Sequence, residues 1–290
     1  MSWPASLPGP GGLNSSSQPH QCTKPKPSHR TSPPFSADVA SSRLRAICSI
    51  AYSSGMEHLL EAPSAGVHAA SDDAATGLRA IGREFHARGW SLGTSSNYSV
   101  VLARDPLELL ITASGKDKSA LGPDDFVRVD ASGHLLDPAA AGGRKSSAET
   151  LLHCLIAEQI PDVGAVLHTH SIWGTMLSRA GLPPGEQLGS LRIAGYEMLK
   201  GLEGITTHET HVDVPIFANS QDMTELADRI QGVFSAADWS DDRRPPLHGF
   251  LLSGHGLYTW GRTLAEARRH IEIFEFLFEV TARQRMLPSA

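Results

Sequence analysis

The chain has 290 residues, of which 40% are hydrophobic, so it can bury a substantial core as one large domain or two small ones. Its formal net charge of −6 gives no general attraction to nucleic acid or anionic membranes, and we expect neither as a partner. No stretch approaches the ~18–20 consecutive apolar residues of a membrane helix. The spacing of Cys22, Cys48 and Cys154 matches neither a disulfide framework nor a zinc cluster, which favours a reducing compartment such as the cytoplasm.

The first 55 residues differ from the rest, with thirteen serines, eight prolines, five basic residues and one acidic residue. Such a segment cannot bury enough apolar surface to offset the entropy of ordering it. We therefore expect a disordered extension over residues 1–66 and a single domain over 67–290. The extension could be a natural tail, a transit-like peptide or sequence upstream of the true start, and the last interpretation, with Met56 as the start, is slightly favoured.

The rest of the chain mixes strand and helix patterns. A Ser-Asp-Asp cap at Ser71, followed by apolar residues at helical spacing, predicts a first helix through Phe85. Strands are expected at 97–103, 107–112, 126–129, 165–170, 212–217, 248–253 and 256–260. Further helices are expected at 147–159, from the fourth strand through 177, at 220–234 and at 263–285, with a loop-rich region over 181–211. This order predicts one α/β domain with helices on both faces of a sheet.

His168 and His170 give the strongest chemical signal, at the end of the apolar run 163–167. Alternate side chains of a strand share a face, so both imidazoles can point at one ion. Three histidines with one position left open to substrate are a recurrent catalytic zinc site. Two histidines that merely pack at a strand end are, on this local pattern alone, an equally good interpretation.

The best third ligand is His255, which lies between two glycines at the end of another apolar run. Those glycines permit unusual dihedral angles and a close approach of the backbone, which a structural histidine does not need. Weaker candidates are His153, His208, His211 and His248. His153 lies one turn after Glu149 on a predicted helix, where a supporting role is as good an interpretation.

Two loops of small residues precede the histidine pair and could bind an anion. The segment 93–97 lies between a helix and a strand, and 114–118 follows a strand. Hydroxyls, free backbone N–H groups and a lysine make a plausible phosphate cradle. Ser146 and Ser147, at a helix N-terminus, could contribute as well.

These motifs, in this order, resemble the class II aldolase family. The matching segments are Gly-Thr-x-x-Asn at 93–97, Ser-Gly at 114–115, Ser-x-Glu-x-x-x-His at 147–153, His-x-His at 168–170 and His-Gly at 255–256. The resemblance, over roughly residues 72–285, implies a three-layer α/β/α domain with a mainly antiparallel sheet. It also implies a homotetramer with sites near subunit interfaces and one zinc ion per subunit, held by His168, His170 and His255.

Within this superfamily, the segments 195–201, 214–223 and 254–261 resemble the methylthioribulose-1-phosphate dehydratase family more than the aldolases. The resemblance implies a zinc-dependent lyase of methionine salvage, which removes water from 5-methylthioribulose 1-phosphate to give the 2,3-diketone. It assigns the acid/base glutamate to Glu197. It assigns the phosphate loops to Ser96, Asn97, Ser114, Gly115 and Lys118, with Ser147 as the remaining hydroxyl.

Two departures leave the roles of Glu149 and Glu197 open. Where the aldolases have paired serines before their catalytic glutamate, this chain has Ser147 and Ala148. It also keeps Glu149 at the aldolase glutamate position, whereas animal dehydratases lack it and use a cysteine that aligns with Thr150, so the chain resembles the bacterial type. The alternatives are an aldolase or pentulose-phosphate epimerase that uses Glu149, and a non-catalytic interaction domain like the cytoskeletal heads of this fold.

Overall fold

The structure is a computed structural model that describes residues 65–241 and 243–288. Most of the expected N-terminal extension, including Met56, therefore lies outside the described residues. The described part contains an eight-stranded sheet in the order β3-β2-β1-β4-β8-β7-β6-β5. The strands are β1 (Asn97–Arg104), β2 (Leu107–Thr112), β3 (Phe126–Asp130), β4 (Ala165–Thr169), β5 (Leu188–Ala194), β6 (His211–Phe217), β7 (Gly249–Leu252) and β8 (Leu257–Gly261).

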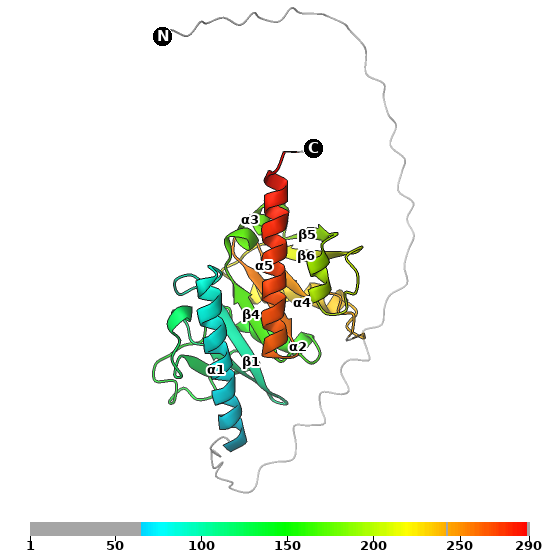
Figure 1. Cartoon of the computed structure of the whole chain (residues 1–290). Helices are drawn as coiled ribbons and strands as arrows, with labels where there is room; N and C mark the ends of the chain where they lie inside the picture. The colour runs from blue at the N-terminus through cyan, green and yellow to red at the C-terminus, as the bar shows by residue number, and fades with distance from the viewer. Residues whose placement is uncertain (1–64, 242, 289–290) are drawn as a thin grey trace, which may run out of the picture. The chain divides into compact units, whose positions relative to one another are not determined.

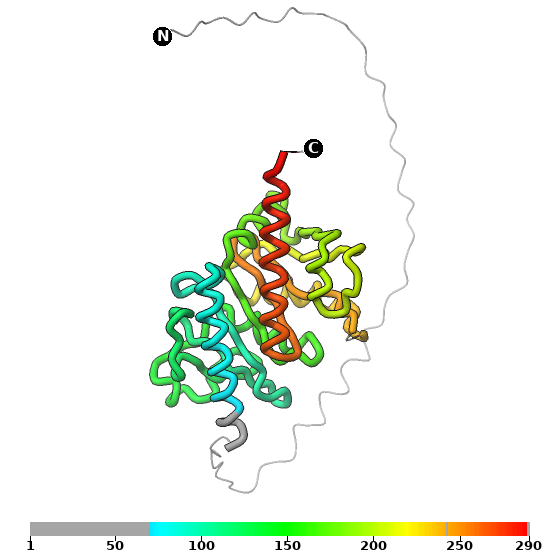
Figure 2. The backbone as a smooth tube through the Cα atoms, in the orientation of Figure 1, coloured from blue at the N-terminus to red at the C-terminus, as the bar shows by residue number. Residues whose placement is uncertain are grey.

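Helices cover both faces of this sheet. One face carries α1 (Ala65–Ala87), α3 (Ile172–Gly181) and α5 (Leu264–Met286), and the other carries α2 (Thr150–Gln159) and α4 (Met223–Ala236). Two short 3-10 helices, η1 (Lys118–Ala120) and η2 (Glu197–Gly201), lie in the connections. In Figure 1, α1 and α5 lie side by side across the near face, where Arg268 of α5 pairs with Glu84 of α1 at 2.7 Å. The tube in Figure 2 traces the same two helices in front of the strands.

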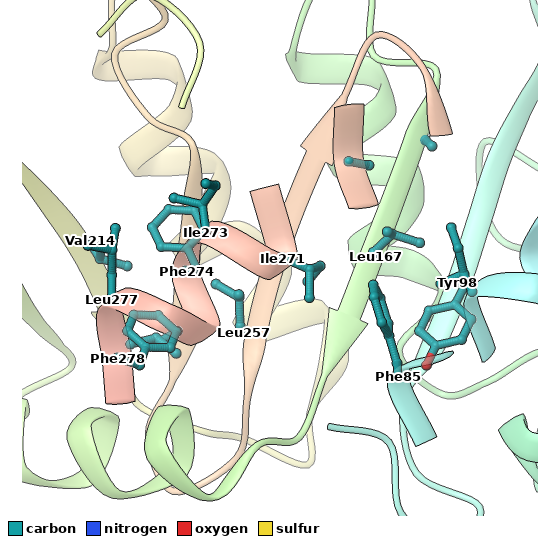
Figure 3. Close-up of a cluster of buried hydrophobic side chains, with 14 of the residues drawn as sticks. Phe85, Tyr98, Leu167, Val214, Leu257, Ile271, Ile273, Phe274, Leu277 and Phe278 are labelled. Atoms are coloured by element: carbon teal, nitrogen blue, oxygen red, sulfur yellow. The ribbon is translucent and has the colours of Figure 1, made fainter. Parts of the chain in front are cut away.

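The side chains of β4 show why the sheet is covered by helices on both faces. Leu167 packs with α1 and α5, whereas the preceding Val166 packs with α2 and α4. This alternation is the period of two that a strand buried on both faces requires. Figure 3 shows the α1/α5 face of the core, with Phe85 of α1 and Phe278 of α5 among the side chains around the sheet.

The sheet confirms the predicted three-layer architecture and its mainly antiparallel pairing. Among the named strands, the only parallel neighbours are β6 and β7, which pair at two positions. The other six neighbouring pairs are antiparallel. Across residues 65–241 and 243–288, we find no helix long and apolar enough to span a membrane.

Four element predictions were wrong in detail. Helix α1 begins at Ala65, so Ser71 lies inside the helix and is not its cap. The region 181–211, expected to be loop-rich, contains strand β5, in which Leu191 and Ile193 are buried while their neighbours are exposed. Its Gly189 and Ser190 weaken the strand signal, because both residues are poor strand formers. Helix α2 begins at Thr150 rather than at Ser147, and α4 begins at Met223 with Asp222 as its cap.

Candidate metal centre

The register of three neighbouring strands assembles the site at one end of β4. His168 lies opposite Asn97 of β1 on one side and opposite Tyr258 of β8 on the other. His255 occupies the tight turn between β7 and β8, where its backbone N–H donates to the carbonyl of Leu252. Because β8 runs beside β4, this turn brings His255 next to the end of the histidine pair.

Gly256 explains the glycine-flanked setting of His255. A Cβ atom at Gly256 would lie 2.0 Å from the carbonyl oxygen of Thr169 and 3.0 Å from the ring of His168. Only glycine allows so close an approach of the two chain segments. On the other side of His255, Gly254 has a φ of +65°, a left-handed conformation that also favours glycine.

The three predicted histidines converge in space. Nε2 of His170 lies 2.7 Å from Nε2 of His168 and 3.1 Å from Nε2 of His255. Together with a carboxylate oxygen of Glu149, these ligand atoms all lie within 4.8 Å of one another. Among the described residues, no other group of three or more histidine, cysteine or acidic side chains comes together in this way.

The surroundings of His168 fix which of its nitrogens faces the cluster as an acceptor. Nδ1 lies 2.8 Å from the carbonyl oxygen of Leu257, so Nδ1 carries the hydrogen and donates it. Nε2 is then left with its lone pair directed at His170. The ring of His168 is fully buried and stacks on Tyr258 at a centroid distance of 4.0 Å.

The donor set fits a zinc-like cation. Burial lowers the pKa of His168 well below its ordinary value and that of His170 to about 4, so both rings are neutral near pH 7. Neutral imidazole nitrogens are the form that binds metal, and facing lone pairs repel one another unless a cation or proton lies between them. Three histidines and one further position match the composition of catalytic zinc sites.

Glu149 completes the cluster from the start of α2. It is the N-cap residue of that helix, yet its side chain makes no capping hydrogen bond. Instead, Oε1 lies 3.0 Å from Nε2 of His255, and Oε2 accepts a hydrogen bond of 2.6 Å from the amide of Asn97. Burial alone would raise the pKa of Glu149, but the contacts with His168, His255 and Asn97 outweigh it and hold the pKa well below its ordinary value.

A buried chain of hydrogen bonds orients Asn97. Its Oδ1 contacts Nε2 of His153, whose Nδ1 lies 2.8 Å from the hydroxyl of Ser99. Since Oδ1 is engaged by His153, the amide N–H₂ group must point at Glu149 and at Ser147, 3.4 Å away. His153 therefore supports the site and does not join the cluster.

The structure brings the two small-residue loops together through Lys118. This side chain is 1% exposed, and its ammonium donates to the carbonyl of Lys116 at 2.7 Å and to that of Thr94 at 3.5 Å. Burial lowers its pKa to about 8. Its positive charge also helps to lower the pKa of His170, which places Lys118 near the cluster.

The remaining predicted phosphate residues lie along the same loops. Ser96 has a φ of +71° and a buried hydroxyl with no partner among the described residues. Ser114 and Gly115 are exposed in the neighbouring loop, and Gly115 also has a positive φ of 71°. Their roles in binding phosphate stay a prediction.

The structure does not bring Glu197 to the cluster within one chain. Its side chain, on η2, is 69% exposed and pairs with Lys200 at 2.7 Å and with His208 at 3.3 Å. The side-chain hydrogen bond from Lys200 lowers the pKa of Glu197 below its ordinary value. Within one chain, Glu197 therefore lies away from the cluster, and its acid/base role stays a prediction.

The weaker histidine candidates also lie elsewhere. His208 pairs with Glu197, His211 pairs with Asp213, and the ring of His248 is bonded to the carbonyl of Glu203. One residue of the site was missed by the sequence analysis, namely Tyr258, which stacks on His168. Its position three residues after His255, on the strand that pairs with β4, was the available signal.

The chain belongs to the family described as Class II Aldolase and Adducin N-terminal domain, which matches residues 76–282. Within that class, it is similar to methylthioribulose-1-phosphate dehydratases. It is 47% identical to the enzyme of that name from Pseudomonas fluorescens over 204 residues, covering 70% of this chain and 89% of the relative. It is 48% identical to an enzyme of the same name from Pseudomonas aeruginosa over 198 residues, covering 68% and 88%.

The solved structures that match share the fold at lower identity. The L-fuculose-1-phosphate aldolase of Thermus thermophilus superposes with a TM-score of 0.54 and 21% identity, over 74% of this chain and 97% of that one. A second L-fuculose 1-phosphate aldolase gives a TM-score of 0.57 at 20% identity, over 75% and 90%. These likenesses establish the fold.

Proposed function

We propose that the chain is a methylthioribulose-1-phosphate dehydratase, a zinc-dependent lyase that removes water from 5-methylthioribulose 1-phosphate in methionine salvage. The observation that carries the proposal is the convergence of His168, His170, His255 and Glu149 in a chain 47% identical to dehydratases of that name. Its place of action is the cytoplasm, in keeping with the free, buried thiol of Cys154.

The three histidines would hold one zinc ion per subunit. Bound there, zinc supplies Lewis-acid polarisation of the substrate's C2 carbonyl and C3 hydroxyl, which acidifies the proton on C3. The loops around Lys118, with Ser96, Asn97, Ser114, Gly115 and Ser147, bind the phosphate. The buried Lys118 ammonium and the Ser96 hydroxyl are the groups best suited to an anion.

Two carboxylates divide the proton transfers. One group must remove the proton from C3, and an acid must assist loss of the C4 hydroxyl, after which the enol ketonises to the 2,3-diketone. Glu149 is poorly suited to the acid role, because its contacts hold its pKa low and keep it ionised. We assign it to orienting His255 and the reacting groups, and we assign the acid/base role to Glu197.

Glu197 can act only from a neighbouring subunit, because it is exposed and away from the cluster in its own chain. We therefore propose a homotetramer in which η2 of one subunit approaches the metal centre of the next. Burial at such an interface would raise the pKa of Glu197 toward the range of an acid/base catalyst.

A class II sugar-phosphate aldolase or pentulose-phosphate epimerase is the second candidate. The position of Glu149 within the cluster favours it, since a carboxylate 3.0 Å from His255 could take the catalytic role in the same chain. Turnover rates separate the candidates. We expect the zinc-loaded chain to consume methylthioribulose 1-phosphate far faster than fuculose 1-phosphate or ribulose 5-phosphate, and the reverse preference would exclude the dehydratase assignment.

A further inference from the structure

A carboxylate is buried behind the metal centre, in the middle of α5. Glu275 is 2% exposed, among the apolar side chains with which α5 packs on the sheet. The hydroxyl of Thr169 donates to its Oε1 at 3.0 Å, and the side chain of Ser171 lies close enough to influence the pKa of the carboxyl group. Its Oε2 has no partner among the described residues. Burying a carboxyl group costs free energy unless hydrogen bonds compensate for the lost water.

The two side chains beside the Glu275 carboxylate alternate with two of the predicted metal ligands. Thr169 lies between His168 and His170, and Ser171 follows directly. Because successive side chains of an extended segment point to opposite sides, His168 turns toward Tyr258 while Thr169 turns toward α5. Glu275 therefore contacts one side of the segment 168–171, and the imidazole of His168 lies on its other side.

The same contacts extend to the third histidine through α3. Ser171 is the N-cap of α3, and its hydroxyl accepts from the backbone N–H of Gly174 at 3.0 Å. One turn further, the hydroxyl of Thr175 donates to the carbonyl of His255 at 2.8 Å. Helix α3 thus ties the end of β4 to the turn that carries His255.

A further hydrogen bond joins the turn between β7 and β8 to α3. The backbone N–H of Gly254 donates to the hydroxyl of Ser178 at 3.1 Å. A shift of the segment 169–171 would therefore move His170 directly and His255 through the helix. Metal sites are sensitive to such shifts, because tetrahedral coordination requires nitrogens at ~2.0–2.1 Å from the ion.

We propose that Glu275 is a positioning residue for the metal centre. From α5, its carboxylate accepts a hydrogen bond from Thr169 and lies beside Ser171, and thereby fixes the relative placement of His168, His170 and His255. Oε1 can accept whether or not the carboxyl group is protonated, so this role does not depend on titration. The inference rests on the proposed function only in that the three histidines hold a metal.

The test compares Glu275→Leu and Glu275→Gln in the full chain. Leucine removes both acceptors at similar size, whereas glutamine keeps the Oε1 acceptor and changes only the unpartnered oxygen. We expect Glu275→Leu to weaken Zn²⁺ binding by about tenfold or more, as loss of a supporting partner does in metal sites. The visible absorption spectrum of the Co²⁺-loaded variant should change as well. Glu275→Gln should keep the wild-type spectrum and bind Zn²⁺ within about threefold of wild type.

Leu277→Ala is the matched control, because it creates a cavity on the same helix and leaves the Glu275 carboxylate in place. It should lower the melting temperature of the metal-free protein while leaving Zn²⁺ affinity and the Co²⁺ spectrum unchanged. If Glu275→Leu fails to fold, Thr169→Val removes one donor at nearly constant shape and should weaken Zn²⁺ binding in the same direction.

Wild-type Zn²⁺ affinity and an unchanged Co²⁺ spectrum in Glu275→Leu or Thr169→Val would overturn the inference, as would an equal loss of affinity in Leu277→Ala. All these measurements are made without substrate. A chain whose metal binding depends on Glu275 but which does not dehydrate the sugar phosphate would contradict the proposed function and leave this inference standing. A wild-type chain that binds neither ion would contradict both.

Discussion

Oε1 of Glu149 lies 3.0 Å from Nε2 of His255, so a carboxylate from one face of the sheet meets an imidazole from the turn between β7 and β8. The two residues are separated by 106 positions in the chain, and the packing of α2 and the order of β1, β4 and β8 in the sheet bring them together. This contact places an ionised carboxylate beside the three histidines. Single substitutions of these residues can therefore test the proposed metal centre.

Replacing His170 with Ala should abolish stoichiometric zinc binding and turnover while the fold is retained. His170 is the histidine whose Nε2 contacts both of the others, at 2.7 and 3.1 Å. Metal content by elemental analysis and far-UV circular dichroism check the two parts of this prediction. His134→Ala, which removes an exposed histidine outside the cluster, is the control. A His170→Ala protein that keeps one tightly bound zinc per subunit would refute the ligand assignment.

Glu197→Gln should cut turnover by about 10²–10⁴-fold with zinc binding intact, because the amide keeps the size but cannot transfer a proton. Glu149→Gln should have a smaller effect on turnover. Glu209→Gln serves as the control, since it is another exposed carboxylate in the same region. The opposite ranking, with Glu149 indispensable and Glu197 tolerant, would move the chemistry to the aldolase position.

Mixing two inactive variants tests whether Glu197 acts across a subunit interface. His168→Ala has an intact Glu197 but no metal site, and Glu197→Gln has the reverse. Subunits that are unfolded together and refolded as mixed oligomers should regain part of the wild-type turnover. Mixed oligomers, verified by differently tagged subunits, that stay inactive would show that each site uses its own chain's residues.

Most of the fold and the convergence of the three histidines could be predicted from the sequence, because both depend on local patterns. The period of two in β4 and the glycines around His255 are local signals of strand geometry and close approach, and Gly256 indeed lies against Thr169. Strand β5 was missed because it lies at the edge of the sheet, where Gly189 and exposed polar residues hide the alternation of Leu191 and Ile193.

Other parts of the site depend on long-range packing that no local pattern encodes. The link between Asn97, His153 and Glu149 joins β1 to α2 across more than fifty positions, and the contact of Glu275 with Thr169 spans 106. The role proposed for Glu197 requires a contact between subunits, which the sequence pattern of one chain does not specify. Sequence spacing therefore predicted ligands and not their supporting contacts.

Acid should destabilise the metal-free protein through its buried histidines. Burial lowers the pKa of His153 to about 4, below the ~6.5 of an unfolded chain. Its contribution to stability is therefore complete above pH ~6.5 and is lost as the pH falls toward 4, because only the unfolded state readily takes up the proton. The free energy of unfolding in urea, measured in chelator at pH 7 and pH 5, should fall with pH.

His153→Gln is the control for that pH dependence. Glutamine can still hydrogen-bond to Asn97 or Ser99 but does not titrate, so the loss of stability between pH 7 and pH 5 should be smaller than in the wild type. An equal loss in both proteins would show that His153 does not contribute to it.

A chain that starts at Met56 should keep the turnover rate and melting temperature of the full chain. Residues 1–55 have the composition of a segment that does not bury a core, although they lie outside the described residues. Activity assays and thermal unfolding of both forms make the comparison. A clear drop in either property would assign a functional or stabilising role to the extension.

The mass of the product formed from methylthioribulose 1-phosphate tests the central claim most directly. Zinc-loaded protein should convert this substrate into a single product that is one water molecule lighter, and His168→Ala should form none of it. An aldolase would instead give two smaller fragments, and an epimerase a product of unchanged mass. Either of those outcomes, or a substrate that stays intact with the metal-loaded wild type, would contradict the dehydratase assignment.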